Sequence, residues 1–227
     1  MRARLLVIAS VWALGCGGGT GTQFGNDGGG DATTTDGGPL GDGSPVFGDS
    51  GANDSSTQND AGPVLVDYVY AHSPSDLYKV DPVKKTMTTV GAFNGCSSVI
   101  DIAVDANNNG YATTFGGVYK LDLTNAKCTL IAQGSYPNSL SFVPAGTLDP
   151  NVEALVGYNG STYVRIDTTT GALTNVGGLT GGYASSGDIV SVQGGGTFLT
   201  VTGGSGNCGD CLLQINPKTG DIIQNYG

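Results

Sequence analysis

Three side chains of a metal-binding type are closely spaced at Asp105, Asn107 and Asn109, directly before Gly110. Alternating carboxylate and amide oxygens followed by a glycine match the first half of a calcium-binding loop. Such a loop ends in a glutamate that supplies two oxygens, and this sequence has Gly116 at that place. The spacing therefore favours a turn between two strands, and calcium binding at Asp105, Asn107 and Asn109 is the alternative.

Side chains suited to acid–base catalysis are scarce, because the chain has one histidine, His72, and one glutamate, Glu153. A histidine can act as a general base near neutral pH. The nearest acidic neighbour of His72 in the sequence is Asp76, and no further catalytic residue type accompanies them. We therefore interpret His72 as a loop or rim residue, and we expect neither a catalytic residue nor a cofactor.

The N-terminus has the pattern of an export signal. Two arginines precede an uncharged apolar run over residues 5–14, which ends in Ala13-Leu14-Gly15-Cys16. These last residues resemble the lipobox of bacterial lipoproteins, although its first position here is alanine, where leucine is commoner. The resemblance implies cleavage after residue 15 and lipidation of Cys16, which would anchor the protein in a membrane. An ordinary signal peptide is the alternative.

Residues 16–62 are predicted to be a disordered tether. Gly, Thr, Ser, Asn and Asp dominate this segment, and it has no Lys or Arg. Such a composition cannot bury enough apolar surface to offset the entropy lost on ordering. A coil of this length spans roughly 35–40 Å. By resemblance to the sorting pattern of proteobacterial lipoproteins, Gly17 after the cysteine favours the outer membrane, with the folded part periplasmic or on the cell surface.

From Pro63 onward the composition changes and an internal repeat is present. Residues 77–81 (LYKVD) recur at 118–122 (VYKLD), at 163–167 (YVRID) and more loosely at 212–216 (LLQIN), with spacings of 41, 45 and 49 residues. A second recurring element precedes these at 101–104, 139–142 and 188–191. Two series with nearly one period indicate a repeat architecture over residues 63–227.

The pattern inside each unit is that of short β-strands. Apolar and polar residues alternate along 119–123, and Asp, Asn and Gly-rich turns separate the runs. The second unit divides into strands near 100–105, 110–114, 117–123 and 127–132. Four antiparallel strands per repeat of this length form the blade of a β-propeller. We therefore predict an all-β fold of about four blades, either complete or incomplete.

The units also resemble YVTN-type propeller repeats, through DIAVDANNNG at 101–110, VRIDTTTG at 164–171 and LQINPKTG at 213–220. The resemblance implies architecture only, because propellers of this kind include binding scaffolds, lactonases and lyases. The units comprise a partial one near 67–93 and three fuller ones. This count is compatible with a truncated copy of a larger propeller, with an open arc that pairs with another subunit, and with a closed four-bladed ring.

Four cysteines besides Cys16 suit an exported protein. Cys208 and Cys211 have the spacing of a redox motif, but a local disulfide across a hairpin near 203–212 is the better interpretation. Cys96 and Cys128 are the other candidate pair. The blade pattern places them at opposite rims, which argues against a bond between them.

The net charge of -10 gives no basic surface for nucleic acid. The remaining hypothesis is a non-enzymatic binding module of the cell envelope, with an envelope protein or a glycan as its ligand. The alternatives are an inactive propeller and a metal-dependent hydrolase or lyase that resembles the gluconolactonase-like propellers. The metal of those enzymes is held by a Glu, an Asn and an Asp in the central channel, and only Glu153 is available here.

Overall fold

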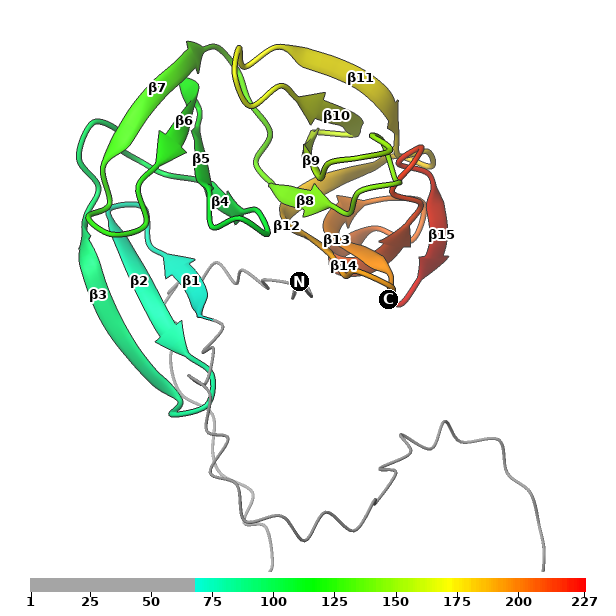
Figure 1. Cartoon of the computed structure of the whole chain (residues 1–227). Coiled ribbons are helices and arrows are strands. Elements are labelled where there is room, and N and C mark those ends of the chain that lie inside the picture. The colour runs from blue at the N-terminus through cyan, green and yellow to red at the C-terminus, as the bar shows by residue number, and fades with distance from the viewer. Residues whose placement is uncertain (1–67) are drawn as a thin grey trace, which may run out of the picture. The chain divides into compact units, whose positions relative to one another are not determined.

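The computed structural model describes residues 68–227, which form fifteen strands in four antiparallel sheets (Figure 1). The signal peptide, Cys16 and the tether all fall outside the described residues. The sheets follow one another along the chain and are arranged around a common centre as the blades of a four-bladed β-propeller. The predicted all-β propeller is therefore confirmed. No helix able to cross a membrane occurs in the part of the chain described.

Blade 1 has three strands and each later blade has four, in the order of the sequence. Blade 1 comprises β1 (Val69–His72), β2 (Asp76–Asp81) and β3 (Thr86–Ala92). Blade 2 comprises β4 (Asp101–Val104), β5 (Gly110–Thr114), β6 (Gly117–Leu121) and β7 (Cys128–Gln133). Blade 3 comprises β8 (Ser141–Val143), β9 (Ala154–Asn159), β10 (Thr162–Ile166) and β11 (Leu173–Gly178). Blade 4 comprises β12 (Tyr183–Ser191), β13 (Thr197–Gly203), β14 (Cys208–Ile215) and β15 (Ile222–Asn225).

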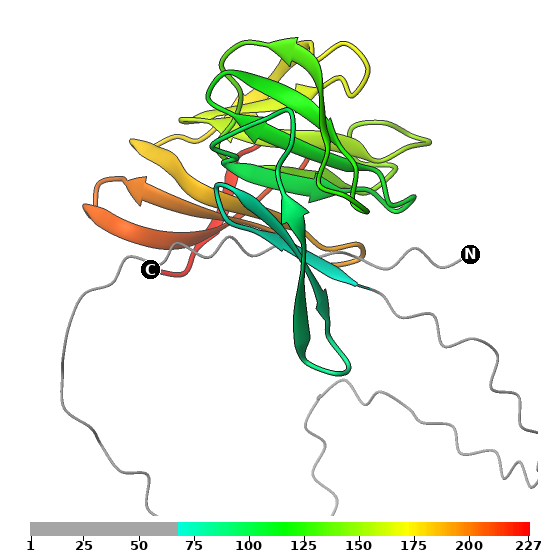
Figure 2. The ribbon, with the colours of Figure 1, turned by 90° about the vertical axis from the view of Figure 1, so that its left-hand side faces the viewer.

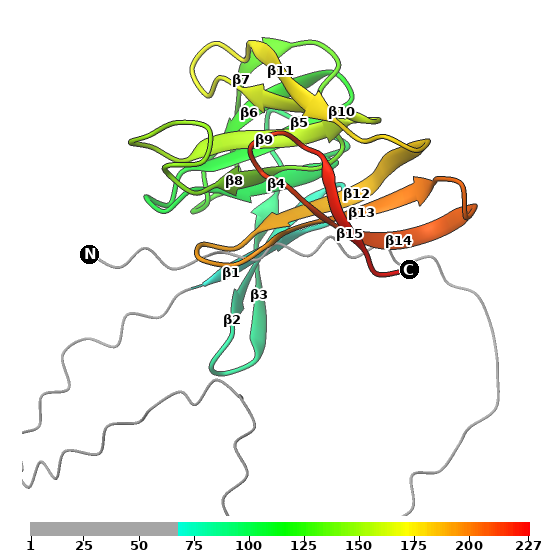
Figure 3. The same cartoon turned by 90° about the vertical axis from the view of Figure 1, so that its right-hand side faces the viewer.

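The recurring motif 77–81 and its copies lie on β2, β6, β10 and β14, the last but one strand of each blade. The repeat then shows which strand blade 1 lacks. Since β2 and β3 correspond to β6 and β7, β1 corresponds to β5 and not to the innermost strand β4. Figures 2 and 3 show blades 1 and 4 from the two sides of the series.

The turn before the last strand of each blade, which we call the outer turn, has one design. A side chain that ends the motif accepts hydrogen bonds from backbone amides two or three residues later, as Asp167 does from Thr169 and Thr170. The residue four positions after it has a positive φ, namely Lys85, Ala126, Gly171 or Gly220. Short polar side chains stabilise such turns, and glycine fits the left-handed position without strain.

Hydrophobic clusters fill the three junctions between successive blades. Leu77 packs with Leu121 and Cys128 between blades 1 and 2. Val118 packs with Ile166 between blades 2 and 3. The third cluster joins blades 3 and 4 through the residues Val143, Ala154, Val156, Tyr158, Tyr163, Ile189, Leu199, Val201, Leu213 and Ile215. Within residues 68–227 no such cluster joins blade 4 to blade 1.

Candidate functional site at the axial end of the blades

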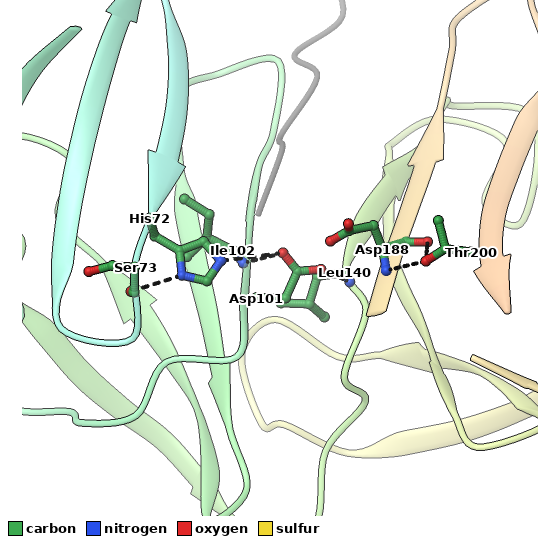
Figure 4. A network of polar contacts seen from close by, with 7 residues as sticks. All are labelled: His72, Ser73, Asp101, Ile102, Leu140, Asp188 and Thr200. Carbon is green, nitrogen blue, oxygen red and sulfur yellow. Dashed lines mark hydrogen bonds and ion pairs between the residues drawn. The ribbon is translucent and has the colours of Figure 1, made fainter. Parts of the chain in front are cut away.

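Three titratable side chains from three different blades meet near the centre of the propeller (Figure 4). His72 is the last residue of β1, Asp101 is the first residue of β4, and Asp188 lies in β12. We call these three residues the axial cluster. The amide of Leu140, just before β8, completes it, so that each blade contributes one group.

Asp101 links three blades through its carboxylate. Its Oδ1 accepts a hydrogen bond of 2.7 Å from the amide of Ile102 in its own blade. Its Oδ2 accepts one of 2.6 Å from the amide of Leu140 in blade 3. The Nε2 atom of His72 in blade 1 lies 3.9 Å from Oδ1, while the Nδ1 atom of His72 contacts the carbonyl oxygen of Ser73 at 3.1 Å.

Burial changes the acidity of Asp101. Because its carboxyl group is almost inaccessible to water, its pKa rises from the ordinary 3.8 to about 6. The contacts with His72 and with the amide of Leu140 oppose this rise, and the charge of Asp188 adds to it. Asp101 therefore exchanges its proton in mildly acidic solution, where an exposed aspartate is fully ionised.

Asp188 is partly exposed and sits where β12 departs from regular pairing. The register of β12 with β13 shifts between Ser185 and Ile189. The hydroxyl of Thr200 accepts a hydrogen bond of 2.9 Å from the amide of Asp188 and lies 3.3 Å from its carbonyl oxygen. The irregular segment directs the Asp188 carboxylate toward Asp101 (Figure 4).

The axial cluster lies at one end of the blades, which we call the axial rim. Four hairpin turns also lie at this rim, one in each blade. They connect β1 to β2, β5 to β6, β9 to β10 and β13 to β14, over residues 73–75, 115–116, 160–161 and 204–207. Asp76 and Asp210 lie beside these turns, and Ser186 donates a hydrogen bond of 2.9 Å to Asp210. Every Lys and Arg among residues 68–227 lies further along its strand or in the opposite turns. The axial rim is therefore acidic.

Two buried hydroxyl groups at this end make no hydrogen bond within the described residues. They are Thr113 Oγ1 and Ser185 Oγ. Thr113 pairs with Asp101 across β4 and β5. The hydroxyl of Ser139, also buried, accepts a hydrogen bond of 3.0 Å from the amide of Tyr158.

The residues that suggested calcium form a tight turn between β4 and β5. The Oδ1 atom of Asp105 accepts hydrogen bonds from the amides of Asn107 and Asn109, at 2.9 and 2.7 Å. Its Oδ2 accepts one of 2.8 Å from the side chain of Asn109. Within residues 68–227 no three His, Cys, Asp or Glu side chains are grouped in a way that could hold a metal ion.

Glu153 lies at the end of the blades opposite the axial cluster. It precedes β9, and its Oε2 accepts a hydrogen bond of 2.8 Å from the amide of Ala106 in the turn between β4 and β5. The side chain thereby ties blade 3 to blade 2. The structure does not bring Glu153 together with Asp101, Asp188 or His72.

Both candidate cysteine pairs form disulfides. Cys208 and Cys211 are bonded across an irregular start of β14, with a Cα–Cα distance of 6.0 Å, as expected. Cys96 and Cys128 are also bonded, at 5.6 Å, so the expectation that they lie too far apart is wrong. The link after blade 1 runs beside the start of β7, where the amide of Cys128 donates a hydrogen bond of 2.7 Å to the carbonyl of Asn94.

Two site residues were missed by reasoning from the sequence, although a signal was present. Asp101 and Asp188 each begin a copy of the second recurring element, and Ser139 begins the copy between them. Asp101 and Asp188 interact near the centre of the propeller, whereas the hydroxyl of Ser139 binds the amide of Tyr158. His72 lies at the axial rim, in line with its interpretation as a loop or rim residue, but it is buried there, and its Nε2 atom lies 3.9 Å from the Oδ1 atom of Asp101.

No protein family and no curated protein matches the sequence. Among solved structures, the chain is similar to hydrazine synthase of Kuenenia stuttgartiensis, with 14% identity over 66% of this chain and 42% of that one and a TM-score of 0.41. It is also similar to the extracellular domain of a one-component system of B. thetaiotaomicron (15%, 70% and 21%, TM-score 0.43). A third similarity is to an auxiliary nutrient binding protein of Bacteroides thetaiotaomicron (15%, 70% and 38%, TM-score 0.41). The chain thus spans less than half the length of each, and no family is assigned.

Proposed function

We propose that this chain is an exported lipoprotein whose propeller is a non-enzymatic binding module for a positively charged ligand. The observation that carries the proposal is the acidic axial rim, which gathers Asp76, Asp101, Asp188 and Asp210 at one end of the blades without a Lys or Arg among the described residues. A concentration of one charge sign attracts ligands of the opposite sign and orients them as they approach.

The chemistry of the rim restricts the ligand further. Carboxylates accept hydrogen bonds, and the exposed side chain of Ser186 at the same end adds a neutral hydroxyl group. Amines satisfy both, since an ammonium group donates three hydrogen bonds. The ligand is therefore a lysine-bearing segment of an envelope protein or a glycan with free amino groups.

Titration with fluorescent pentalysine, and separately with chitosan oligosaccharide, tests the binding proposal. For whichever of the two probes binds, Asp188→Asn should weaken the affinity about tenfold, as expected for the loss of one charged hydrogen bond. Asp221→Asn is the matched control, because it removes the same charge from an exposed outer turn at the opposite end and should leave the affinity unchanged. Equal weakening by both variants, or binding of neither probe, would contradict the proposal.

Lipid anchoring at Cys16 is a separate part of the proposal with its own support. The apolar run and the residues 13–16 resemble a lipoprotein signal, and the disulfides Cys96–Cys128 and Cys208–Cys211 suit an oxidising compartment. The intact mass of the protein from its native membranes should equal residues 16–227 plus a diacylglyceryl and an acyl group. A mass without the lipid increment would refute the anchor and leave the binding proposal standing.

A further inference from the structure

The outer strand of each of the first three blades carries a very small residue at one repeated position. This residue pairs with the first residue of the recurring motif, as Gly91 does with Leu77, Ala132 with Val118, and Gly177 with Tyr163. The motif residues Leu77, Val118 and Tyr163 are fully buried. The repeated position therefore lies on the side of the blade that the next blade covers.

The outer turn of the following blade passes over this position. The approach is ordinary in blade 1, where a Cβ atom on Gly91 would lie 3.7 Å from the carbonyl oxygen of Asn125, and much closer in blades 2 and 3. A Cβ atom on Gly177 would overlap the carbonyl oxygen of Thr219 in the outer turn of blade 4. At the junction before it, a Cβ atom on Gly171 in the outer turn of blade 3 would lie 2.5 Å from the Cβ atom of Ala132. Closely packed backbone at these junctions leaves no room for a larger side chain.

Blade 4 has a tyrosine at this position. The amide of Tyr226 donates a hydrogen bond of 2.9 Å to the carbonyl of Leu212, which corresponds to Leu77, Val118 and Tyr163. The ring of Tyr226 lies 6.2 Å from that of Phe198, and its hydroxyl contacts Oε1 of Gln214 at 3.1 Å. Leu212 is 40% exposed and Tyr226 is 51% exposed, so no segment within residues 68–227 covers this side of blade 4.

Blade 1 presents the complementary side. Val80 and Met87 pair across β2 and β3 and correspond to Leu121 and Cys128 of blade 2. Blade 1 covers Leu121 and Cys128, which are 2% and 5% exposed, whereas Met87 is 63% exposed. Blade 4 thus exposes the side that the next blade covers in blades 1 to 3. Blade 1 exposes the side that the preceding blade covers in blades 2 to 4. Within residues 68–227 these two surfaces are the unlike halves of one further blade-to-blade junction.

We propose that Tyr226 prevents copies of this protein from joining head to tail, with blade 4 of one copy against blade 1 of a second copy. The internal junctions show what fits each exposed half, namely a blade of this same repeat. Unlike halves on one chain form a heterologous interface, which builds rings or filaments. The Tyr226 ring occupies the space that the outer turn of the incoming blade 1 needs, and so keeps the interface from closing.

Replacing Tyr226 by glycine tests the proposal in the full chain. In sedimentation experiments Tyr226→Gly should self-associate, because Leu212 and Met87 become buried in the interface. The protein concentration needed for this should be at least about tenfold lower than the concentration at which the wild type self-associates, if it does so at all. Tyr226→Phe is the matched control, since it keeps the ring and loses only the contact with Gln214, and it should sediment like the wild type. Tyr226→Ala, which copies Ala132, provides the same test if the glycine variant fails to fold.

A second substitution identifies the surface involved. Adding Met87→Lys to Tyr226→Gly places a charge in the proposed interface and should restore the sedimentation of the wild type. Persistent association of this double variant would overturn the proposal, because a different surface would then be responsible. The proposal would also be overturned if Tyr226→Gly and Tyr226→Ala both fold and sediment like the wild type. Self-association of the wild type through the surface that contains Met87 would overturn it too, because Tyr226 would then not block the interface.

Discussion

Replacing Asp101 by asparagine should remove a pH-dependent part of the free energy of unfolding. The pKa of Asp101 is about 6 in the folded protein, against an ordinary value of 3.8. Between these values the unfolded chain has lost the proton and the folded chain keeps it. The folded state then binds more protons than the unfolded state, so stability falls as the pH rises through this window. A difference of about two pKa units corresponds to about 3 kcal/mol.

The asparagine variant separates this effect from the loss of a hydrogen bond. Asparagine keeps one acceptor oxygen, whereas the amides of Ile102 and Leu140 need two. One buried amide is left without a partner, at a cost of about 1–3 kcal/mol. At about pH 4 the variant should be less stable than the wild type by this amount. Near pH 7 the balance should shift by about 3 kcal/mol in favour of the variant, because only the wild type then buries a charge, so the difference in stability should vanish or change sign.

Urea unfolding of the full chain at several pH values between about 4 and 7 measures both quantities. Titration of the other carboxyl groups is common to both proteins and cancels in the difference between them. Asp188→Asn should reduce the pH dependence of the wild type without abolishing it, because burial raises the pKa of Asp101 more than the charge of Asp188 does. A difference between wild type and Asp101→Asn that stays constant with pH, or widens as the pH rises, would refute the reasoning.

Three further substitutions test the packing of the blades through thermal or urea unfolding. Gly177→Ala should destabilise the protein by about 2–3 kcal/mol, because the added Cβ atom overlaps Thr219. Gly206→Ala is the control and should be neutral, because its Cβ atom meets open space. Equal effects of the two substitutions would contradict the account of the junction. Replacing Cys96 and Cys128 by serine should cost about 3–4 kcal/mol, and replacing Cys208 and Cys211 about 2 kcal/mol, because the first disulfide closes the longer loop; the reverse order would count against this. Tyr158→Phe should cost about 1–2 kcal/mol by removing the buried 2.7 Å hydrogen bond to the carbonyl of Gly220, and an unchanged stability would exclude a role for that bond in holding blades 3 and 4 together.

The fold was predictable from the sequence because each blade repeats the same local pattern. The motif at 77–81 and its copies mark one strand of every blade, and the strands predicted for the second unit match β4 to β7 closely. The alternation of apolar and polar residues indicates which residues face a neighbouring sheet, and the Asp and Gly residues indicate where the turns lie. These signals are local, so they need no knowledge of how the blades meet.

The Cys96–Cys128 bond shows where such reasoning ends. The blade pattern correctly assigned Cys96 to the link between blades 1 and 2 and Cys128 to the start of an outer strand, but it could not define the path of that link. In the structure Asn94 pairs beside Lys127, and this short bridge brings the two Cα atoms to 5.6 Å. The path of a link depends on packing between sheets, which no pattern within one blade records.

The sequence by itself determined the repeat, the strands and the turn chemistry, because periodicity and glycine placement act within a few residues. It also set the acidic balance and the lipobox-like segment that suggests export. Only the tertiary structure decided that His72, Asp101 and Asp188 meet, since they come from blades 1, 2 and 4. The role inferred for Tyr226 likewise depends on the tertiary structure, because a tyrosine on an outer strand obstructs a junction only where the outer turn of another blade must pass.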